Sequence, residues 1–221
     1  SEMCIRDRSK ATGFPIALVS AMLAAGLTLK DIECGKYGTL DKYKPDGDYI
    51  VIKFARWAFE KFKGVEDKLG TQMRAVGEVM SIGKTYKEAF QKAIRSLETG
   101  RYGLGFAKDY NEKSKEELLR MLATPSSDRH FIMYEALRKG ATVDEIFDIT
   151  KVKHYFVEQM KELVEEEEAI AKSKGSLPSD EQLISAKKNG FSDKYLSQIL
   201  AIPEDDIRNK RIELGIEESW E

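Results

Sequence analysis

The pattern of hydrophobic and polar residues changes near residue 100. Before that point, segments of strand type alternate with helical segments. Residues 48–59 are rich in β-branched side chains near their start, which predicts a strand, and residues 77–83 predict a second, buried strand. Residues 86–97 carry apolar side chains at helical spacing behind Thr85 and Glu88, a pattern typical of a capping box. The first part of the chain is therefore predicted to be a small α+β unit.

After residue 100, all the predicted elements are helices. The glycines of the RYGLG segment (residues 101–105) mark the break. A longer helix is expected after Thr150, with one apolar face formed by Phe156, Met160, Leu163, Val164 and Ile170. The fold is thus predicted to be mostly α, with a small α+β N-terminal part followed by an all-α helical domain. The residues expected to open helices here are Ser127, Thr142 (with Glu145 in a capping box), Ser179, Ser192 and Pro203.

The N-terminal segment permits two interpretations. Arg6, Arg8 and Lys10 precede an apolar run at residues 14–26, as in a secretory signal peptide. The alternative, a buried helix, is favoured because Pro15 suits the start of a helix and the run is too short to span a membrane. A short helix capped by Thr28 is expected to follow.

The segment from Gly77 to Thr85 resembles a phosphate-binding P-loop only superficially. Five residues separate Gly77 from Gly83, whereas the P-loop spacing needs four. The intervening side chains are those of a strand, so a strand–turn–helix unit is predicted instead. Glu78 stands out within this apolar strand, because a buried carboxylate is costly unless it is paired or used.

Other candidate chemistry is sparse. The two cysteines, Cys4 and Cys34, lack metal-ligand spacing, and so few cysteines fit a reducing compartment. His130 is expected on a helix surface. The run Glu165–Glu168 is predicted to be a solvated face and not a metal site, because consecutive residues point around a helix instead of converging.

Net charge argues against nucleic acid as a partner. The formal charge is −2, which gives no global attraction for nucleic acid or anionic lipid. Residues 190–216 could form a helix-turn-helix, with residues 203–214 as the recognition helix. However, residues 176–221 contain six Lys or Arg and ten Asp or Glu, a net charge of −4, and the recognition helix would begin with three acids. A DNA-binding role is therefore disfavoured.

Several segments resemble the large chain of carbamoyl-phosphate synthetase. The strongest is GTQMRAVGEVMSIGKT (residues 70–85), with SKATGFPIA upstream at residues 9–17. Residues 53–62 are similar too, although Ala55 stands where the family has proline. The resemblance is collinear from Ser9 to about Gly215. Downstream, it is carried by SDRHFIMYEALRKGATVDEIFDIT, YFVEQMKELV and KKNGFSDKYLSQI.

The resemblance implies a domain organisation. Residues 1–8 match nothing in the family and are expected to be a non-native leader. Residues 9–98 would be the C-terminal part of the carboxyphosphate-forming ATP-grasp domain, and residues 99–221 the helical oligomerisation domain. The family's Glu-x-Asn-x-Arg motif for nucleotide and metal is absent. The chain is therefore expected to be a fragment that is inactive alone, with no catalytic, cofactor-binding or metal-ligating residues assigned.

The resemblance also implies a reaction and a passage. In the family, ATP phosphorylates bicarbonate, ammonia attacks the carboxyphosphate, and the carbamate travels through the protein to a second phosphorylation. By resemblance, Met73, Val76 and Glu78 would line this carbamate path. The plainer interpretation is that Glu78 is a structural glutamate satisfied by a hydrogen bond.

Cofactors and partners follow from the same resemblance. ATP and Mg²⁺ (or Mn²⁺) would serve the full-length enzyme, which supports arginine and pyrimidine biosynthesis, while this piece would bind neither. Its partners would be the glutaminase small subunit, the rest of the large chain and further copies joined through the helical domain, with no nucleic acid and no membrane, in the cytoplasm. The alternatives are a free-standing helical interaction module or a helix-turn-helix DNA-binding protein.

Overall fold

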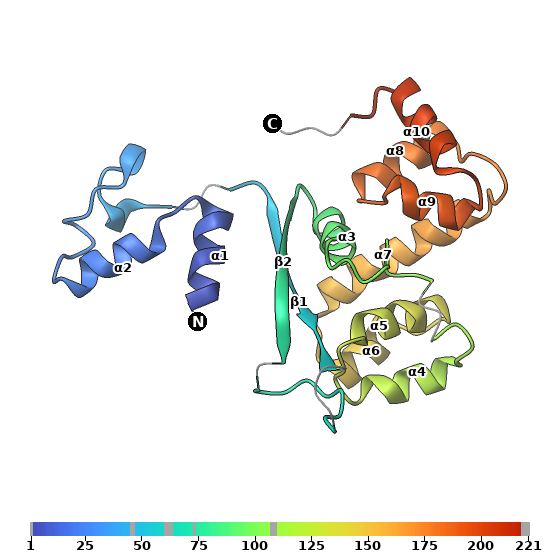
Figure 1. Cartoon of the computed structure of the whole chain (residues 1–221), viewed down its shortest axis with the longest axis horizontal. Coiled ribbons are helices and arrows are strands. Elements are labelled where there is room, and N and C mark those ends of the chain that lie inside the picture. The colour runs from blue at the N-terminus through green and yellow to red at the C-terminus, as the bar shows by residue number, and fades with distance from the viewer. Residues whose placement is uncertain (1, 45–46, 60–63, 73, 107–109, 218–221) are drawn as a thin grey trace. The chain divides into compact units, whose positions relative to one another are not determined.

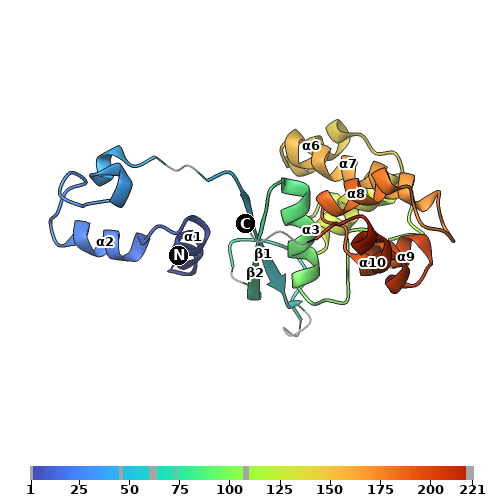
Figure 2. The same cartoon turned by 90° about the horizontal axis from the view of Figure 1, so that it is seen from above.

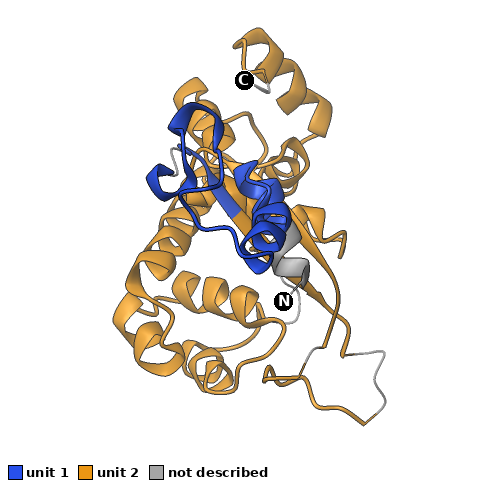
Figure 3. Cartoon of the chain, turned by 90° about the vertical axis from the view of Figure 1, so that its left-hand side faces the viewer, with its two compact units in different colours: residues 1–51 blue, residues 52–221 orange. Residues whose placement is uncertain are grey.

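The computed structural model describes residues 2–44, 47–59, 64–72, 74–106 and 110–217. It divides into two compact units, residues 1–51 and residues 52–221 (Figure 3). Met73, one of the proposed path residues, lies outside the described residues. The two units are considered separately below.

The first unit contains two helices and two single turns of 3₁₀ helix. Helix α1 spans Glu2–Thr12 and packs against α2, Ile16–Ala24. The 3₁₀ turns η1 and η2 span Gly35–Tyr37 and Leu40–Lys42. A short hydrogen bond from the Tyr49 hydroxyl to the Ala11 carbonyl, 2.5 Å long, ties the end of this unit to α1.

Two sequence predictions fail in this unit. Helix α2 is present, but none of its residues is buried, and Leu18 and Leu23 are exposed. A unit this small cannot enclose a core of its own, and Ile32 is the one buried side chain among its described residues. Thr28 does not cap a helix: its hydroxyl and its backbone N–H both bond to the Asp31 carboxylate, at 2.6 Å and 2.8 Å, which closes a turn.

The second unit begins with a two-stranded antiparallel sheet covered on one face by a helix. Strand β1 spans Ile50–Trp57, β2 spans Ala75–Gly83, and α3 spans Tyr86–Ser96. Helix α3 packs against β2 on one side and against α7, His154–Ala171, on the other (Figures 1 and 2). The strand–turn–helix prediction is confirmed.

The sheet has one covered face and one open face. On the covered face, Phe54 and Ser81 are buried, and the Ser81 hydroxyl donates to the Ala89 carbonyl of α3 at 2.6 Å. On the other face, Val76 is 49% exposed and Ile82 is 45% exposed. The second strand is therefore confirmed, but the prediction that it is buried holds for one face only, because α3 covers just that face.

The turn between β2 and α3 departs from the predicted capping box. The Thr85 hydroxyl accepts from the Glu88 backbone N–H, as predicted. The Glu88 carboxylate, however, accepts from the Lys84 backbone N–H at 2.8 Å and pairs with Lys92 at 2.6 Å. A complete capping box would also have a bond from the Thr85 backbone N–H to the Glu88 carboxylate. Lys92 lies one turn along α3 and holds the carboxylate away from that position.

The remaining helices form the predicted all-α part. Their order is α4 (Lys115–Leu122), α5 (Arg129–Arg138), α6 (Val143–Thr150), α7, α8 (Asp180–Lys188), α9 (Asp193–Leu200) and α10 (Glu204–Glu213). Helix α7 lies between α4–α6 and α8–α10 in Figure 1, and it packs against α5, α6 and α9. The starts predicted after Thr142, Ser179, Ser192 and Pro203 are confirmed.

Three details of the helical part differ from the predictions. Asp128, not Ser127, precedes α5, because the Ser127 hydroxyl bonds to Asp67 of the β1–β2 connection at 2.5 Å. Phe156 is exposed, and Val157 takes its place in the core face of α7. Helix α4, which begins at a complete capping box, was not individually predicted.

His130 is half-buried, not exposed on the helix surface as predicted. Its ring packs against Phe54 of β1 and Phe90 of α3, with centroid separations of 4.9 Å and 5.6 Å. Burial lowers the pKa of the imidazole from 6.5 to about 3, and the neighbouring Arg129 charge adds to the shift. The neutral ring therefore joins α5 to β1 and α3 through aromatic contacts.

Stability should fall on mild acidification because of His130. The pKa of His130 is lower in the folded chain than in the unfolded chain. As the pH drops below about 6.5, the unfolded chain therefore binds a proton that the folded chain does not, and the free energy of unfolding decreases. Between pH 7 and pH 5.5 we expect a loss of about 1 kcal/mol in unfolding free energy. Urea unfolding at both pH values would measure it. His130→Phe should remove this loss and His154→Gln should keep it; an unchanged loss in His130→Phe would contradict the assignment.

Candidate functional site

The first candidate site is the open face of the sheet at Glu78. The Glu78 carboxylate pairs with Lys53 of β1, with Oε2 2.7 Å from Nζ. Their side chains are 28% and 33% exposed, so this is a half-buried pair and not a buried carboxylate. Val76 lies on the same face of β2, two residues before Glu78. The structure thus places Val76 and Glu78 together.

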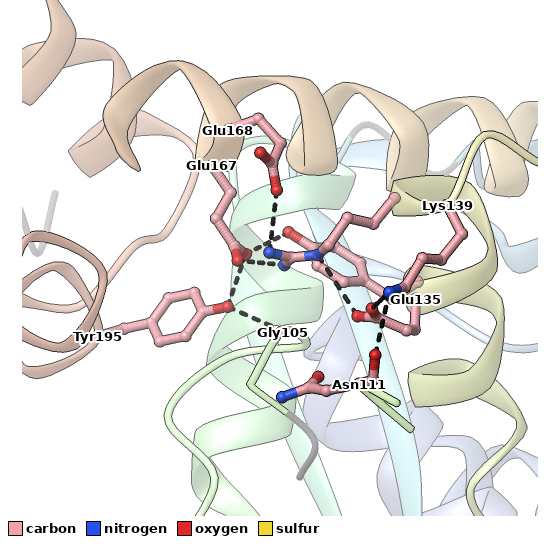
Figure 4. A network of polar contacts seen from close by, with 9 residues as sticks. Gly105, Asn111, Glu135, Lys139, Glu167, Glu168 and Tyr195 are labelled. Atoms are coloured by element: carbon pink, nitrogen blue, oxygen red, sulfur yellow. Dashed lines mark hydrogen bonds and ion pairs between the residues drawn. The ribbon is translucent and has the colours of Figure 1, made fainter. Parts of the chain in front are cut away.

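The second candidate site is a buried polar network around Glu167 of α7 (Figure 4). Glu167 is 1% exposed. Its Oε2 accepts hydrogen bonds from the Tyr134 hydroxyl of α5 at 2.5 Å and from the Tyr195 hydroxyl of α9 at 2.6 Å. Its Oε1 accepts from the guanidinium of Arg138. A single carboxylate therefore joins three helices, with donors on both oxygens.

The three groups that donate to Glu167 are held in fixed protonation states. Burial and the neighbouring carboxylate raise the pKa of Tyr134 and Tyr195 well above 10, so both hydroxyls remain donors. Burial alone would lower the pKa of Arg138, but the charge of Glu167 raises it above its usual value. Neither the two tyrosines nor Arg138 is therefore poised to transfer a proton near neutral pH.

A glycine segment closes one side of this network. The Gly105 backbone N–H donates to the Tyr195 hydroxyl at 2.9 Å, as Figure 4 shows. A Cβ on Gly105 would lie 2.5 Å from both the Tyr195 hydroxyl and Glu167 Oε1, and one on Gly103 would overlap the Tyr195 ring. Only glycine allows the backbone to approach this closely.

Arg138 extends the network toward solvent. It donates to Glu168 Oε1 at 3.0 Å, and its Nε lies 3.4 Å from Glu135 Oε2. Burial raises the pKa of Glu135, although Arg138 and Lys139 oppose the shift. Lys139 in turn donates to the Asn111 carbonyl at 3.0 Å, which ties the segment before α4 to α5 (Figure 4).

Comparison with known proteins decides the family. Residues 78–215, more than half of the chain, match the family model described as carbamoyl-phosphate synthetase large chain, oligomerisation domain. The chain belongs to this family. The match includes α8–α10, so the segment considered as a helix-turn-helix is part of the oligomerisation domain, and the DNA-binding alternative is not supported.

Curated relatives extend the similarity to the N-terminal part. A carbamoyl phosphate synthase large chain, N-terminal section, from Methanopyrus kandleri is 41% identical over 96% of this chain and 40% of its own length. The large chain of Nostoc sp. is 42% identical over 94% of this chain and 19% of its own. An arginine-specific, chloroplastic large chain of Arabidopsis thaliana is 42% identical over 96% and 18%. This chain therefore spans from about a fifth to two fifths of these relatives.

The segment from Gly77 to Gly83 forms a strand and not a phosphate loop. Gly77 lies within β2 and Gly83 ends it, and a Cβ on Gly83 would lie 2.8 Å from the Ala89 nitrogen, so no phosphate loop forms between them. Within the described part of the chain, no group of three or more His, Cys, Asp or Glu converges on a common point. Among the described residues, no helix has the length and apolar character needed to cross a bilayer.

The sequence interpretation missed Glu167 and assigned it to a solvated face. The signal was present, because Glu167 follows Met160, Leu163 and Val164 at helical spacing on the buried face of α7. The prediction failed because the four glutamates were treated as a run. Only Glu167 points inward, while Glu165 and Glu168 are exposed.

Glu167→Gln should destabilise the chain strongly. The amide leaves the partly buried Arg138 without its closest anion and places an N–H₂ group among donors, so we expect a loss of about 2–4 kcal/mol in unfolding free energy. Glu168→Gln is the matched control. It removes an exposed pair to the same Arg138 and should cost less than about 1 kcal/mol. Urea unfolding measures the loss of unfolding free energy in both variants. Equal losses would show that the buried carboxylate of Glu167 stabilises the chain no more than the exposed carboxylate of Glu168 does.

Proposed function

We propose that this chain serves in the synthesis of carbamoyl phosphate from bicarbonate, ammonia and ATP, as part of a complete large chain. The observation that carries the proposal is the 41% identity to the Methanopyrus kandleri large-chain section over 96% of this chain. Identity at this level, running through both the sheet and the helices, supports a shared role for the whole segment. Residues 9–98 would then belong to the carboxyphosphate-forming domain, and residues 99–221 to the oligomerisation domain.

The remaining components would lie outside this segment. ATP with Mg²⁺ (or Mn²⁺) would bind to other parts of the large chain, and a glutaminase small subunit would supply ammonia. The enzyme would work in the cytoplasm and serve arginine and pyrimidine biosynthesis. The described residues form no phosphate loop or metal cluster, so no nucleotide step is assigned to them.

The helical part is proposed to join copies of the enzyme. The matched family model is named for oligomerisation, and the rigid α5–α7–α9 arrangement around Glu167 would keep a docking surface in constant shape. Sedimentation equilibrium of residues 1–221 over a range of concentrations should show association. A monomer at all of them would contradict this part of the proposal.

The open face of the sheet is proposed to border the carbamate path, through Met73, Val76 and Glu78. Carboxyphosphate and carbamate decompose in water, so the reaction needs an enclosed passage. The observations that support this placement are the exposed Val76 and the half-buried Glu78 on one face of β2, opposite the core. A covering partner over this face would turn it into a dry wall with one fixed carboxylate.

Glu78→Ala, made in a complete large chain that carries this segment, should lower overall carbamoyl phosphate formation. A bulky Val76→Trp substitution should do the same by narrowing the passage. Bicarbonate-dependent ATP hydrolysis and ATP formation from carbamoyl phosphate should persist, because neither partial reaction requires transfer between sites. All three rates are measured on one preparation, together with its melting temperature. Parallel loss of all three with a lower melting temperature would instead make Glu78 a structural residue.

A further inference from the structure

Three aromatic side chains form a partly exposed cluster where α3 meets the start of α7. Tyr155 is 52% exposed and Phe156 is 39% exposed, and their ring centroids lie 5.4 Å apart. Tyr86 of α3 contacts both rings, with centroid separations of 5.9 Å and 5.3 Å. Together these residues make up the aromatic cluster, and none of the three belongs to either candidate site.

The aromatic cluster is anchored to the core from beneath. The Tyr86 ring stacks on that of Phe90, with centroids 5.4 Å apart, and Phe90 is 2% exposed. Burial raises the pKa of Tyr86 to about 12, so its hydroxyl stays protonated. Val157, the residue after Phe156, is completely buried. Rings held in place lose little conformational freedom on binding, and adjacent exposed aromatic side chains are typical of interaction surfaces.

A polar rim borders the aromatic cluster along α7. Lys87, next to Tyr86, has its Nζ 2.7 Å from Glu162 Oε2, and Glu162 lies two helical turns beyond Tyr155 on the same side of α7. An apolar centre within a polar rim is the usual arrangement of a protein contact. The occupant is therefore expected to offer an apolar side chain to the rings, and not a charged group.

The size of the aromatic cluster decides what kind of occupant it can hold. The exposed parts of Tyr155 and Phe156 amount to roughly 200 Å², since an aromatic side chain presents about 150–250 Å² in total. A stable contact between free proteins needs about 800 Å² on each partner. A tethered segment needs far less, because its effective concentration is on the order of millimolar. A cluster this small therefore favours a segment of the same polypeptide over a second copy.

We propose that the aromatic cluster is the docking site of a segment of the same large chain that lies outside residues 1–221. The inference rests on the proposed function, in which this chain is part of a complete large chain. The curated relatives leave ample length for such a segment, because this chain covers 40% of the Methanopyrus kandleri section and 19% of the Nostoc sp. large chain. Since Tyr86 belongs to the proposed carboxyphosphate-forming part and Tyr155 to the helical part, one docked segment would contact both.

Thiol labelling at position 155 tests whether the aromatic cluster is covered. Tyr155→Cys is prepared both in residues 1–221 and in a complete large chain carrying this segment, and peptide mass spectrometry follows its alkylation rate. We expect the rate to be roughly tenfold lower in the complete chain, because a covered thiol is inaccessible. A thiol in the first turn of a helix has a lowered pKa and reacts faster, so the position itself does not explain slow labelling.

Lys161→Cys is the matched control. The Lys161 side chain is 51% exposed and also lies on α7, but six residues after Tyr155 it points to a different side of the helix. Its labelling rate should agree within about twofold between the two chains. Equal rates for Tyr155→Cys in the two chains, or protection that is lost on dilution as for a second copy, would overturn the inference. A complete chain that forms no carbamoyl phosphate would overturn the proposed function, whereas the labelling rates would still decide whether the cluster is covered.

Discussion

The buried carboxylate of Glu167 is the interaction on which the helical domain depends. An isolated carboxylate with 1% exposure would be strongly unfavourable. Two tyrosine hydroxyls and one guanidinium offset this cost, and they come from α5 and α9, which are 28–33 residues away from Glu167 along the chain. Because each donor must reach one small group, the carboxylate fixes the positions of α5 and α9 relative to α7 more narrowly than apolar packing alone would.

Two glycines pack closely against Tyr195, one of the groups that bond to Glu167. The backbone at Gly103 and Gly105 lies against the ring and hydroxyl of Tyr195, at a distance that a side chain at either glycine would prevent. The RYGLG segment lies between α3 and α4 in the chain, so this contact links the connection after α3 to α9. His130 and Phe90 complete the connection from the apolar side, through ring contacts with Phe54 of β1.

Local signals in the sequence predicted most of the fold. β-Branched runs, N-cap residues and helix periods are short-range properties, and they located β1, β2, α3 and six of the later helices. The failures concern contacts between distant residues. Ser127 looked like a cap but bonds to Asp67, and His130 looked exposed but packs on Phe54. Burial of α2 could not be judged either, since burial depends on what covers a helix and not on its own sequence.

At the candidate site, too, local features could be predicted from the sequence and contacts between distant residues could not. The resemblance named Val76 and Glu78, which lie on one face of β2, but the sequence contained no rule that would pair Glu78 with Lys53, 25 positions earlier. The role of this face in a carbamate path remains a proposal drawn from family resemblance. Its physical basis is an open, largely apolar strand face that carries Glu78, paired with Lys53.

Native-state hydrogen exchange tests the central claim, that Glu167 makes α5, α7 and α9 one cooperative unit. If the account is correct, the core amides of these helices exchange through a common opening with the same free energy and the same dependence on denaturant. If the amides of α9 open at a clearly lower free energy than those of α5 and α7, the carboxylate does not join the helices, and the account is contradicted.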